Sequence, residues 1–360
     1  MAQVMSQVMV AMKNRAHEQA YAQFGTKRFV GLQDVAVDLN RLNEPGLWAV
    51  IGSFEGAWLL LKFEKEIENT SNFIGQWKGI DPKNWISSMN KSEYESAVEG
   101  LRQHISLGDV YQANICRVLA TEIENEGFEI EGLANLLTTG NPAPYSCVIN
   151  VKEQAHERLT KDVALVSASP ELFLERKDQH ISSSPIKGTG RTASDLTDKD
   201  RAENVMIVDL VRNDLSRVCQ TGSINVPSLL EIQEHPGLVH LVSTISGELN
   251  ENTTWSQIFD ATFPPGSVSG APKISALKLI KKFETSLRGP YCGAIGWINT
   301  FNNTASIAVG IRTFWKDKNK LLFGTGAGIT WGSEPEKEWQ ETELKCAKLF
   351  EVASKAQGHT

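Results

Sequence analysis

Hydrophobic positions along the chain follow two periodicities, one typical of strands and one typical of helices. The run at 46–65, GLWAVIGSFEGAWLLLKFEK, is rich in β-branched and aromatic residues separated by glycines, and it predicts two strands joined by a turn. Further along, apolar residues recur at helical spacing at Tyr94, Val98 and Leu101, and the helix ends at Gly108. The following stretch, DVYQANICRVLATEI, predicts a strand.

The second half of the chain mixes the same two patterns. Residues 163–190 predict strand, turn and strand, and 197–218 predict a long helix with Thr197 as N-cap and Asp200 completing a capping box. Strands are also expected within 238–249 and 294–332.

A last helix is expected from about Pro335, with Ser333 as its N-cap and Glu336 three residues later. The strands and helices do not alternate as βαβ units. The pattern therefore favours a large α+β sheet sandwich over a doubly wound fold. The polar, tryptophan-containing stretch 71–85 is a plausible boundary.

Composition narrows the class of protein. The chain has 360 residues, 41% of them hydrophobic, which is enough for a substantial core. With 36 Lys and Arg against 43 Asp and Glu the net charge is −7, which argues against nucleic acid or anionic membrane as the main partner. Its five widely spaced cysteines form no CxxC pair, so a disulfide framework and a zinc site are both disfavoured.

The opening 24 residues carry polar residues throughout and lack the apolar block of a signal peptide or membrane span. They are expected to form an amphipathic helix, and the protein is expected to be cytoplasmic.

Two glycine-rich stretches resemble nucleotide-binding loops only superficially. GSVSGAPK at 266–273 lacks the Gly-Lys-Ser/Thr ending of a P-loop, and GTGAGITWG at 324–332 leads into no long apolar helix. Both stretches still let backbone N–H groups converge on an anion, although a purely structural turn explains either one equally well.

Acidic residues on two predicted helices suggest a cation site. Glu203 shares a helical face with Ile207 and Leu210, and a carboxylate directed toward a core needs a partner. Glu338 and Glu341 are three residues apart and so also share a face, for which a solvated surface is the plainer explanation. Acids from two helices are nevertheless the ligands that Mg²⁺ accepts.

Hydrogen-bonding and cationic groups lie at predicted strand ends beside glycines: His240, Tyr291 and Arg312. Each also has a structural explanation, since a strand-end arginine can pair with a nearby acid and a histidine in an apolar run is often a core residue. Taken together, the groups suggest a site for a small polyanion bridged by a divalent cation. Lys187, in the small-residue loop SSSPIKGTGRT, has a solvated loop lysine as its ordinary interpretation.

Ten ordered blocks between about 90 and 350 resemble the chorismate-utilising enzymes. They are GDVYQANI, SASPELF, PIKGT, DRAENVMIVDLVRNDLSRV, HLVSTISGEL, FPPGSVSGAPK, YCGAIGW, VGIRTF, GTGAGI and EPEKEWQET. The resemblance implies an α+β fold, a single large domain of two packed antiparallel sheets flanked by helices. It also implies a shortened N-terminal region at 1–90, integrated into the fold, and a chorismate-binding catalytic domain at 91–355.

The resemblance assigns roles to individual residues. Glu203 and Glu341, with Glu338 beside them, would bind Mg²⁺, which would hold the ring carboxylate of chorismate. The backbone of Gly326, Ala327 and Gly328 would bind that same carboxylate. The remaining pocket residues would be Tyr291 and Arg312 at the enolpyruvyl carboxylate, His240 near the ring hydroxyl, and Thr189, Ser267 and Gln112 along the pocket.

Within this family, aminodeoxychorismate synthases carry Lys at the position of Lys187, where anthranilate synthases usually carry Ala. Lys187 would then be the nucleophile and Glu171 the general acid and base. Gln112 stands where water-using relatives carry Lys, which favours a nitrogen nucleophile. The ammonia would come from a glutamine amidotransferase subunit, and a later lyase would give 4-aminobenzoate for folate. The alternatives are an anthranilate synthase component I and a non-catalytic chorismate-binding paralogue.

Overall fold

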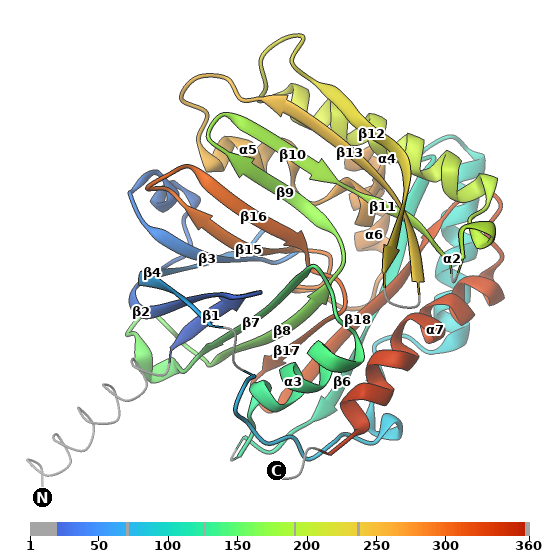
Figure 1. The fold of residues 1–360 in the computed structure, drawn as a ribbon. Coiled ribbons are helices and arrows are strands. Elements are labelled where there is room, and N and C mark those ends of the chain that lie inside the picture. Colours follow the sequence, from blue (N-terminus) through green and yellow to red (C-terminus); the bar gives the residue numbers. More distant parts are fainter. Residues whose placement is uncertain (1–19, 70–71, 126, 191, 236–237, 357–360) are drawn as a thin grey trace, which may run out of the picture.

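Antiparallel strands form the framework of the molecule (Figure 1). The computed structural model describes residues 20–69, 72–125, 127–190, 192–235 and 238–356. The strands in chain order are β1 (Tyr21–Phe24), β2 (Lys27–Ala36), β3 (Leu47–Gly52), β4 (Trp58–Glu68), β5 (Ile86–Ser87), β6 (Gln112–Glu122), β7 (Tyr145–Val151), β8 (Val163–Ser169), β9 (Leu172–Lys177), β10 (His180–Ser184), β11 (Ile186–Gly190), β12 (Asn225–His235), β13 (Leu238–Glu248), β14 (Gly270–Ala271), β15 (Ala294–Asn299), β16 (Thr304–Val309), β17 (Thr313–Asp317) and β18 (Lys320–Ile329). The α-helices are α2 (Lys91–Ser106), α3 (Ile130–Gly140), α4 (Asp198–Ser216), α5 (Trp255–Thr262), α6 (Lys273–Phe283) and α7 (Pro335–Ser354).

Hydrogen bonds link these strands into one continuous antiparallel network. Its path runs from β12 through β13, β10, β9, β16, β15, β3, β4, β2, β1, β7, β8, β17 and β18 to β6. β11 lies beside β13 near one end, and β5 and β14 lie beside β6 at the other. The predicted α+β class, with a large antiparallel sheet framework and helices outside, is confirmed. The two sheets expected from the sequence are joined by hydrogen bonds into this one network.

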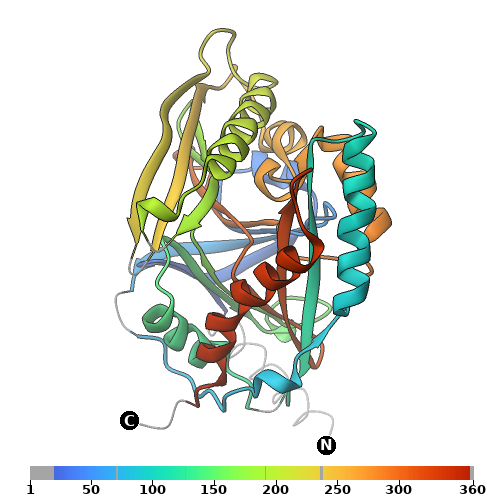
Figure 2. The ribbon, with the colours of Figure 1, turned by 90° about the vertical axis from the view of Figure 1, so that its right-hand side faces the viewer.

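Helices cover the two ends of this network. α4 packs on β13 and β11, while α7 packs on β18 and against α2. Figure 2 shows α2, α4 and α7 together on one side of the molecule. Among the described helices, none combines the length and the apolar character needed to cross a membrane.

Two large hydrophobic clusters hold the layers together. The larger cluster includes buried residues of β3, β4 and β15 and of the helices α2, α4, α5 and α6. The smaller lies under α3 and α7, where the Trp85 and Phe350 rings stack at 4.5 Å between centroids. Trp77 joins the smaller cluster and donates its indole N–H to the carbonyl of Ala353 at 2.7 Å. The stretch 71–85 thus contributes two buried tryptophans to the packing beneath α7.

Several elements form where the sequence predicts them. The run at 46–65 gives paired β3 and β4, and the helical spacing around Val98 gives α2. α4 begins with the expected capping box, in which Thr197 and Asp200 each bond the other's backbone N–H.

Two local expectations are wrong. The N-cap of α7 is Glu334, not Ser333, because the Ser333 hydroxyl instead accepts the backbone N–H of Thr330 at 3.0 Å. The helix expected over the first 24 residues is wrong for the last four of them. Tyr21–Phe24 form the strand β1, which is paired with β2 on one side and with β7 on the other. Pairing on both edges satisfies the backbone of β1, so tertiary structure outweighs local helix preference there. The rest of that prediction lies outside the described residues.

Candidate functional site

Lys187 lies on β11 and points into the interior between the two ends of the strand network. Gly188 adopts a left-handed φ of +82°, and the pairing of β11 with β13 shifts register between Ile186 and Thr189. Such an irregularity in a strand changes the direction of the neighbouring side chain, here that of Lys187. Glycine can adopt the required left-handed backbone because it carries no Cβ. The Lys187 amine donates to the carbonyl oxygen of Ser267 at 2.9 Å. Burial lowers its pKa, while the carboxylates of Glu203 and Glu171 act in the opposite direction.

Glu171 lies between β8 and β9 and is 4% exposed. Burial raises its pKa to about 7, against the opposing effects of the Ser267 hydroxyl and the Lys187 amine. Its Oε1 atom is buried without a hydrogen-bond partner. A carboxyl group with this pKa exchanges protons near neutral pH, as a general acid and base must.

Ser267 connects these two groups. It lies in a short 3-10 helix, Gly266–Val268, which packs against Leu210 of α4. Its carbonyl accepts from Lys187 and its hydroxyl bonds to Glu171. The structure therefore brings three of the predicted site residues, from three separate segments, into one hydrogen-bonded set.

β18 presents glycines at alternate positions on one face. A Cβ on Gly328 would lie 2.6 Å from Gln112 Nε2, 3.4 Å from Asn114 Oδ1 and 3.6 Å from the Lys187 amine. A Cβ on Gly324 would enter the Tyr291 ring at 2.1 Å. The sequence pattern GTGAG thus keeps this face of the strand flat, so that side chains from β6 and β11 can reach it.

Tyr291 is buried and Arg312 is half-buried, and the two lie in different surroundings. Arg312 has a φ of +52° at the turn before β17, and burial lowers the pKa of its guanidinium with no described carboxylate opposing it. A half-buried cation of this kind is suited to an anionic ligand. The Tyr291 hydroxyl instead bonds to the Cys292 thiol.

His240 is 2% exposed on β13 and lies opposite Thr189 of β11 in the sheet register. Of these two predicted site residues, Thr189 is therefore on β11, the strand that carries Lys187, and His240 is on β13, which pairs with β11.

The predicted acidic set comes together from α4 and α7. The Lys199 amine lies 3.7 Å from a Glu203 carboxylate oxygen and 3.9 Å from one of Glu338, so the two acids share one cation. Burial raises the pKa of both carboxyls. Glu341 is half-exposed and pairs with Lys345 at 2.6 Å.

The donors of this acidic set are carboxylate oxygens, which are the ligands that a hard divalent cation prefers. Their negative charge already attracts one amine, that of Lys199. Within the described ranges, no three Asp, Glu, His or Cys side chains are grouped closely enough to hold a metal by themselves. Substrate oxygens would have to complete the shell.

One site residue was missed by the sequence analysis. Asn114 lies two residues beyond Gln112 on β6, and the period of two along a strand places both side chains on the face toward Gly328. That alternation is the signal that could have found it.

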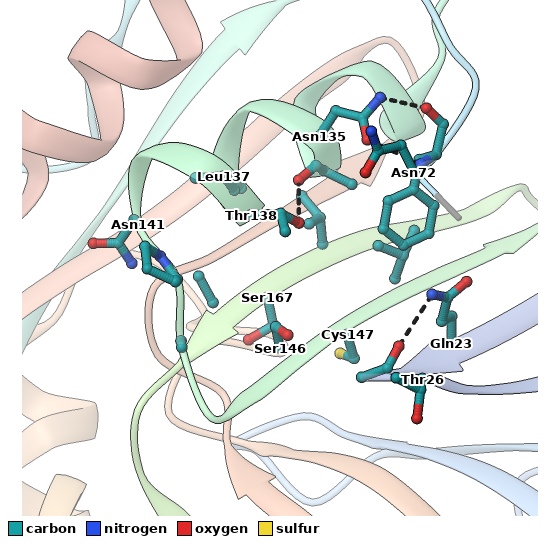
Figure 3. A pocket seen from close by; sticks show the side chains of 18 of the residues that line it. Gln23, Thr26, Asn72, Asn135, Leu137, Thr138, Asn141, Ser146, Cys147 and Ser167 are labelled. Atoms are coloured by element: carbon teal, nitrogen blue, oxygen red, sulfur yellow. Dashed lines mark hydrogen bonds between the residues drawn. The ribbon is translucent and has the colours of Figure 1, made fainter. Parts of the chain in front are cut away.

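A separate cavity of about 280 Å³ lies between α3 and the strands β1, β7 and β8 (Figure 3). Its polar lining is uncharged and includes Gln23, Asn135, Thr138 and Asn141. It shares no residue with the set around Lys187, so the two are distinct places in the fold.

The Lys187 amine and the Glu171 carboxyl, with its pKa of about 7, are joined through Ser267 and define a candidate catalytic centre. The Arg312 guanidinium is a further group suited to an anionic small molecule. The family model described as chorismate binding enzyme matches residues 62–351. The chain belongs to this family.

Curated relatives agree with that assignment. The chain is 34% identical over 295 residues to anthranilate synthase component 1 of Aquifex aeolicus, covering 78% of this chain and 57% of the relative. It is also 34% identical over 278 residues to aminodeoxychorismate synthase component 1 of Salmonella typhimurium, covering 74% and 58%. The chain thus spans less than two thirds of these relatives.

The fold is shared with anthranilate synthase component I from Streptococcus pneumoniae, with a TM-score of 0.74 at 22% identity over 92% of each chain. It is shared also with a putative 2,3-dihydroxybenzoate-specific isochorismate synthase, DhbC, from Bacillus anthracis, with a TM-score of 0.77 at 21% identity over 96% of this chain and 99% of that one. At this identity, these likenesses concern the fold alone.

Proposed function

We propose that this chain is the synthase component of an aminodeoxychorismate synthase, which converts chorismate and ammonia to 4-amino-4-deoxychorismate. The observation that carries the proposal is the Lys187 amine, held beside Glu171 through Ser267. A lysine attacks carbon only when it is neutral, and the burial that lowers its pKa favours that form.

The chemistry divides into two displacements. Lys187 adds at C2 of chorismate while the C4 hydroxyl leaves as water, with the proton supplied by Glu171. Ammonia then forms the C4–N bond, the C2–N bond to Lys187 breaks, and the proton lost by the new amine returns to Glu171. The pKa of about 7 lets Glu171 serve in both directions.

Substrate binding is assigned to the anion-binding groups of the site. Arg312 would hold one carboxylate, with its planar fork suited to bidentate pairing, and Tyr291 would lie beside it. The backbone of Gly326 to Gly328 and the side chains of Ser267 and His240 would complete the pocket.

Magnesium, when bound, would neutralise the other carboxylate of the substrate. Glu203 and Glu341 would hold it, with Glu338 adjacent. The support for this proposal is the burial of Glu203 and Glu338 and their attraction of the single Lys199 amine.

Ammonia would be supplied by a glutamine amidotransferase partner. We infer this from the likeness to relatives named component 1. The product would serve 4-aminobenzoate and folate formation in the cytoplasm after a lyase step.

The second candidate is an anthranilate synthase component 1, a name carried by a relative at 34% identity. The lysine at position 187 favours the first candidate, because anthranilate formation requires no enzyme-linked intermediate at C2.

The test is to identify the product. Purified chain is incubated with chorismate and an ammonium salt, with and without Mg²⁺, and the product is identified by chromatography and mass spectrometry. We expect 4-amino-4-deoxychorismate, formed only with Mg²⁺ present. Lys187→Ala should lose most of this activity, and Lys187→Arg should lose it equally, because arginine keeps the charge but is no nucleophile.

Anthranilate as the product would favour the second candidate, and no turnover would favour a non-catalytic paralogue. Recovery of activity in Lys187→Arg would show that position 187 acts through its charge alone.

A further inference from the structure

Lys273 closes the segment of the chain that carries Ser267. Residues 263–272, the Ser267 segment, run from the end of α5 to the start of α6. The Lys273 amine donates to the carbonyl of Thr262 at 2.9 Å and pairs with the Asp214 carboxylate of α4 at 2.6 Å. One amine therefore ties the two ends of the Ser267 segment to each other and to α4.

This connection is largely buried. The Lys273 and Asp214 side chains are 15% and 8% exposed. A hydrogen bond between two charged groups is stronger and shorter than a neutral one, and it fixes the direction of both side chains. Pro272, the N-cap of α6, makes no side-chain capping bond. Lys273 is thus the residue whose side chain holds this end of the segment.

The same connection reaches the reacting groups. Asp214, Thr262, Ser267 and Glu171 line one small cavity of about 10 Å³. It has room for no more than about one water molecule, so it does not hold a substrate. Ser267 accepts from Lys187 at 2.9 Å and bonds to Glu171 through its hydroxyl. A displacement of the segment would therefore change the positions of both groups.

We propose that Lys273 is a positioning residue, which acts through Asp214, Thr262 and the Ser267 segment to hold Lys187 and Glu171 in their reactive geometry. The inference rests on the proposed function and adds to it a residue outside the reacting set. A misplacement of ~1 Å caused from far away can cost about a hundred-fold in rate, because the reacting atoms must meet at one distance and angle.

The decisive variant is Lys273→Met, which keeps the length of the side chain and removes its charge and its hydrogen bonds. We expect kcat to fall by about ten-fold to a hundred-fold. The KM for chorismate should change much less, because Arg312 and the backbone of Gly326 to Gly328, which are assigned to the carboxylates, belong to other segments. Lys273→Arg keeps a cation that can pair with the carboxylate of α4, and it should recover most of the kcat.

Lys316→Met is the matched control. The Lys316 side chain is 6% exposed and also pairs with an aspartate, Asp162, at 3.0 Å. This pair involves β17 and lies beside Phe128, which packs on the smaller hydrophobic cluster. Lys316→Met should lower the free energy of unfolding but leave kcat at the wild-type value, measured at a temperature where all the proteins are folded.

Hydrogen–deuterium exchange tests the connection without turnover. The backbone N–H groups of Val268 and Ser269 are hydrogen-bonded within the Ser267 segment, so they exchange slowly while the segment is held. They should exchange faster in Lys273→Met than in the wild type, and at the wild-type rate in Lys316→Met. Lys273→Met combined with Asp214→Asn removes the carboxylate that would be buried without its cation, and it serves if the single variant does not fold.

The outcomes separate the two proposals. Wild-type chain that forms no aminated chorismate would refute the proposed function, while faster exchange in Lys273→Met would still support the connection through Lys273. Unchanged exchange in Lys273→Met would overturn that connection. Faster exchange with a wild-type kcat would overturn the positioning role, and an equal loss of kcat in Lys316→Met would assign the loss to general destabilisation.

Discussion

At the scale of single residues, Glu171 and Lys187 show how one buried pocket shifts two titratable groups in opposite directions. Burial disfavours the charged form of each, so the carboxyl pKa rises to about 7 and the amine pKa falls. The two pKa values move toward each other and toward neutrality, where proton exchange is fastest. The site also lowers the stability of the fold, because oxygens of Glu171, Gln112 and Asn114 are buried without hydrogen bonds.

Glu171 should make stability depend on pH. Its carboxyl pKa is 4.5 when unshifted and about 7 in the folded protein. Because folding raises this pKa, the stabilising contribution is fully present below about pH 4.5 and is lost as the pH rises through 7. We expect Glu171→Gln to be more stable than the wild type above pH 7, by up to ~3 kcal/mol, with the difference shrinking toward pH 4.

Urea unfolding of both proteins across this pH range measures that difference. A difference independent of pH would contradict the raised pKa. Asn141→Leu, which changes no titratable group, is the control and should show a constant difference from the wild type.

At the scale of elements, the site is held by a buried arginine that joins three segments. Arg288 is 1% exposed, and its guanidinium donates to Glu284, to the carbonyl of Val268 at 2.8 Å and to the carbonyl of Asn114 at 3.1 Å. Glu284 in turn accepts the backbone N–H of Cys116 at 2.9 Å. β6, the Ser267 segment and the chain after α6 are thereby fixed relative to one another.

Arg288→Met should destabilise the fold by ~3–5 kcal/mol, because it leaves the Glu284 carboxylate buried without its cation. Replacing both partners, as Arg288→Met with Glu284→Gln, should be less damaging than the sum of the single changes. The free energy of unfolding in urea, measured for all four proteins of this cycle, checks both statements. Additive effects would show that the two side chains do not stabilise the site as a pair.

At the scale of the whole molecule, the continuous strand network makes the N-terminal residues part of the fold. β3 is hydrogen-bonded to β15 along its length, and β1 is hydrogen-bonded to β7. β15 and β7 come from much later in the chain, and β7 leads through β8 and β17 to the strand that carries Gly328.

A chain that begins at Asn72 should therefore fail to fold cooperatively. It would leave β15 and β7 each with an unpaired edge and expose the core beneath β3. Circular dichroism and urea unfolding, compared with the full chain, measure the effect. A single cooperative transition with native-like β-sheet signal in the shortened chain would contradict this prediction.

Prediction from sequence worked best where local signals are strong. The glycine-separated β3–β4 pair, α2 and the capped α4 have periodicity or caps that are visible in the chain itself. β12, α3, α5 and α6 were not foreseen, and β1 was placed in a helix, because their formation depends on neighbours distant in sequence.

The candidate site divides in the same way. The sequence by itself determined which residues are present to do chemistry: a lysine before a glycine, a glutamate after a proline, and alternating glycines on one strand. Only the tertiary structure decided that Lys187, Ser267 and Glu171 share hydrogen bonds, that Asn114 and Lys187 both lie near Gly328, and that the pKa values of Lys187 and Glu171 shift. The physical reason is that burial and hydrogen bonding arise between segments brought together by folding, and no local pattern records how much water remains around a side chain.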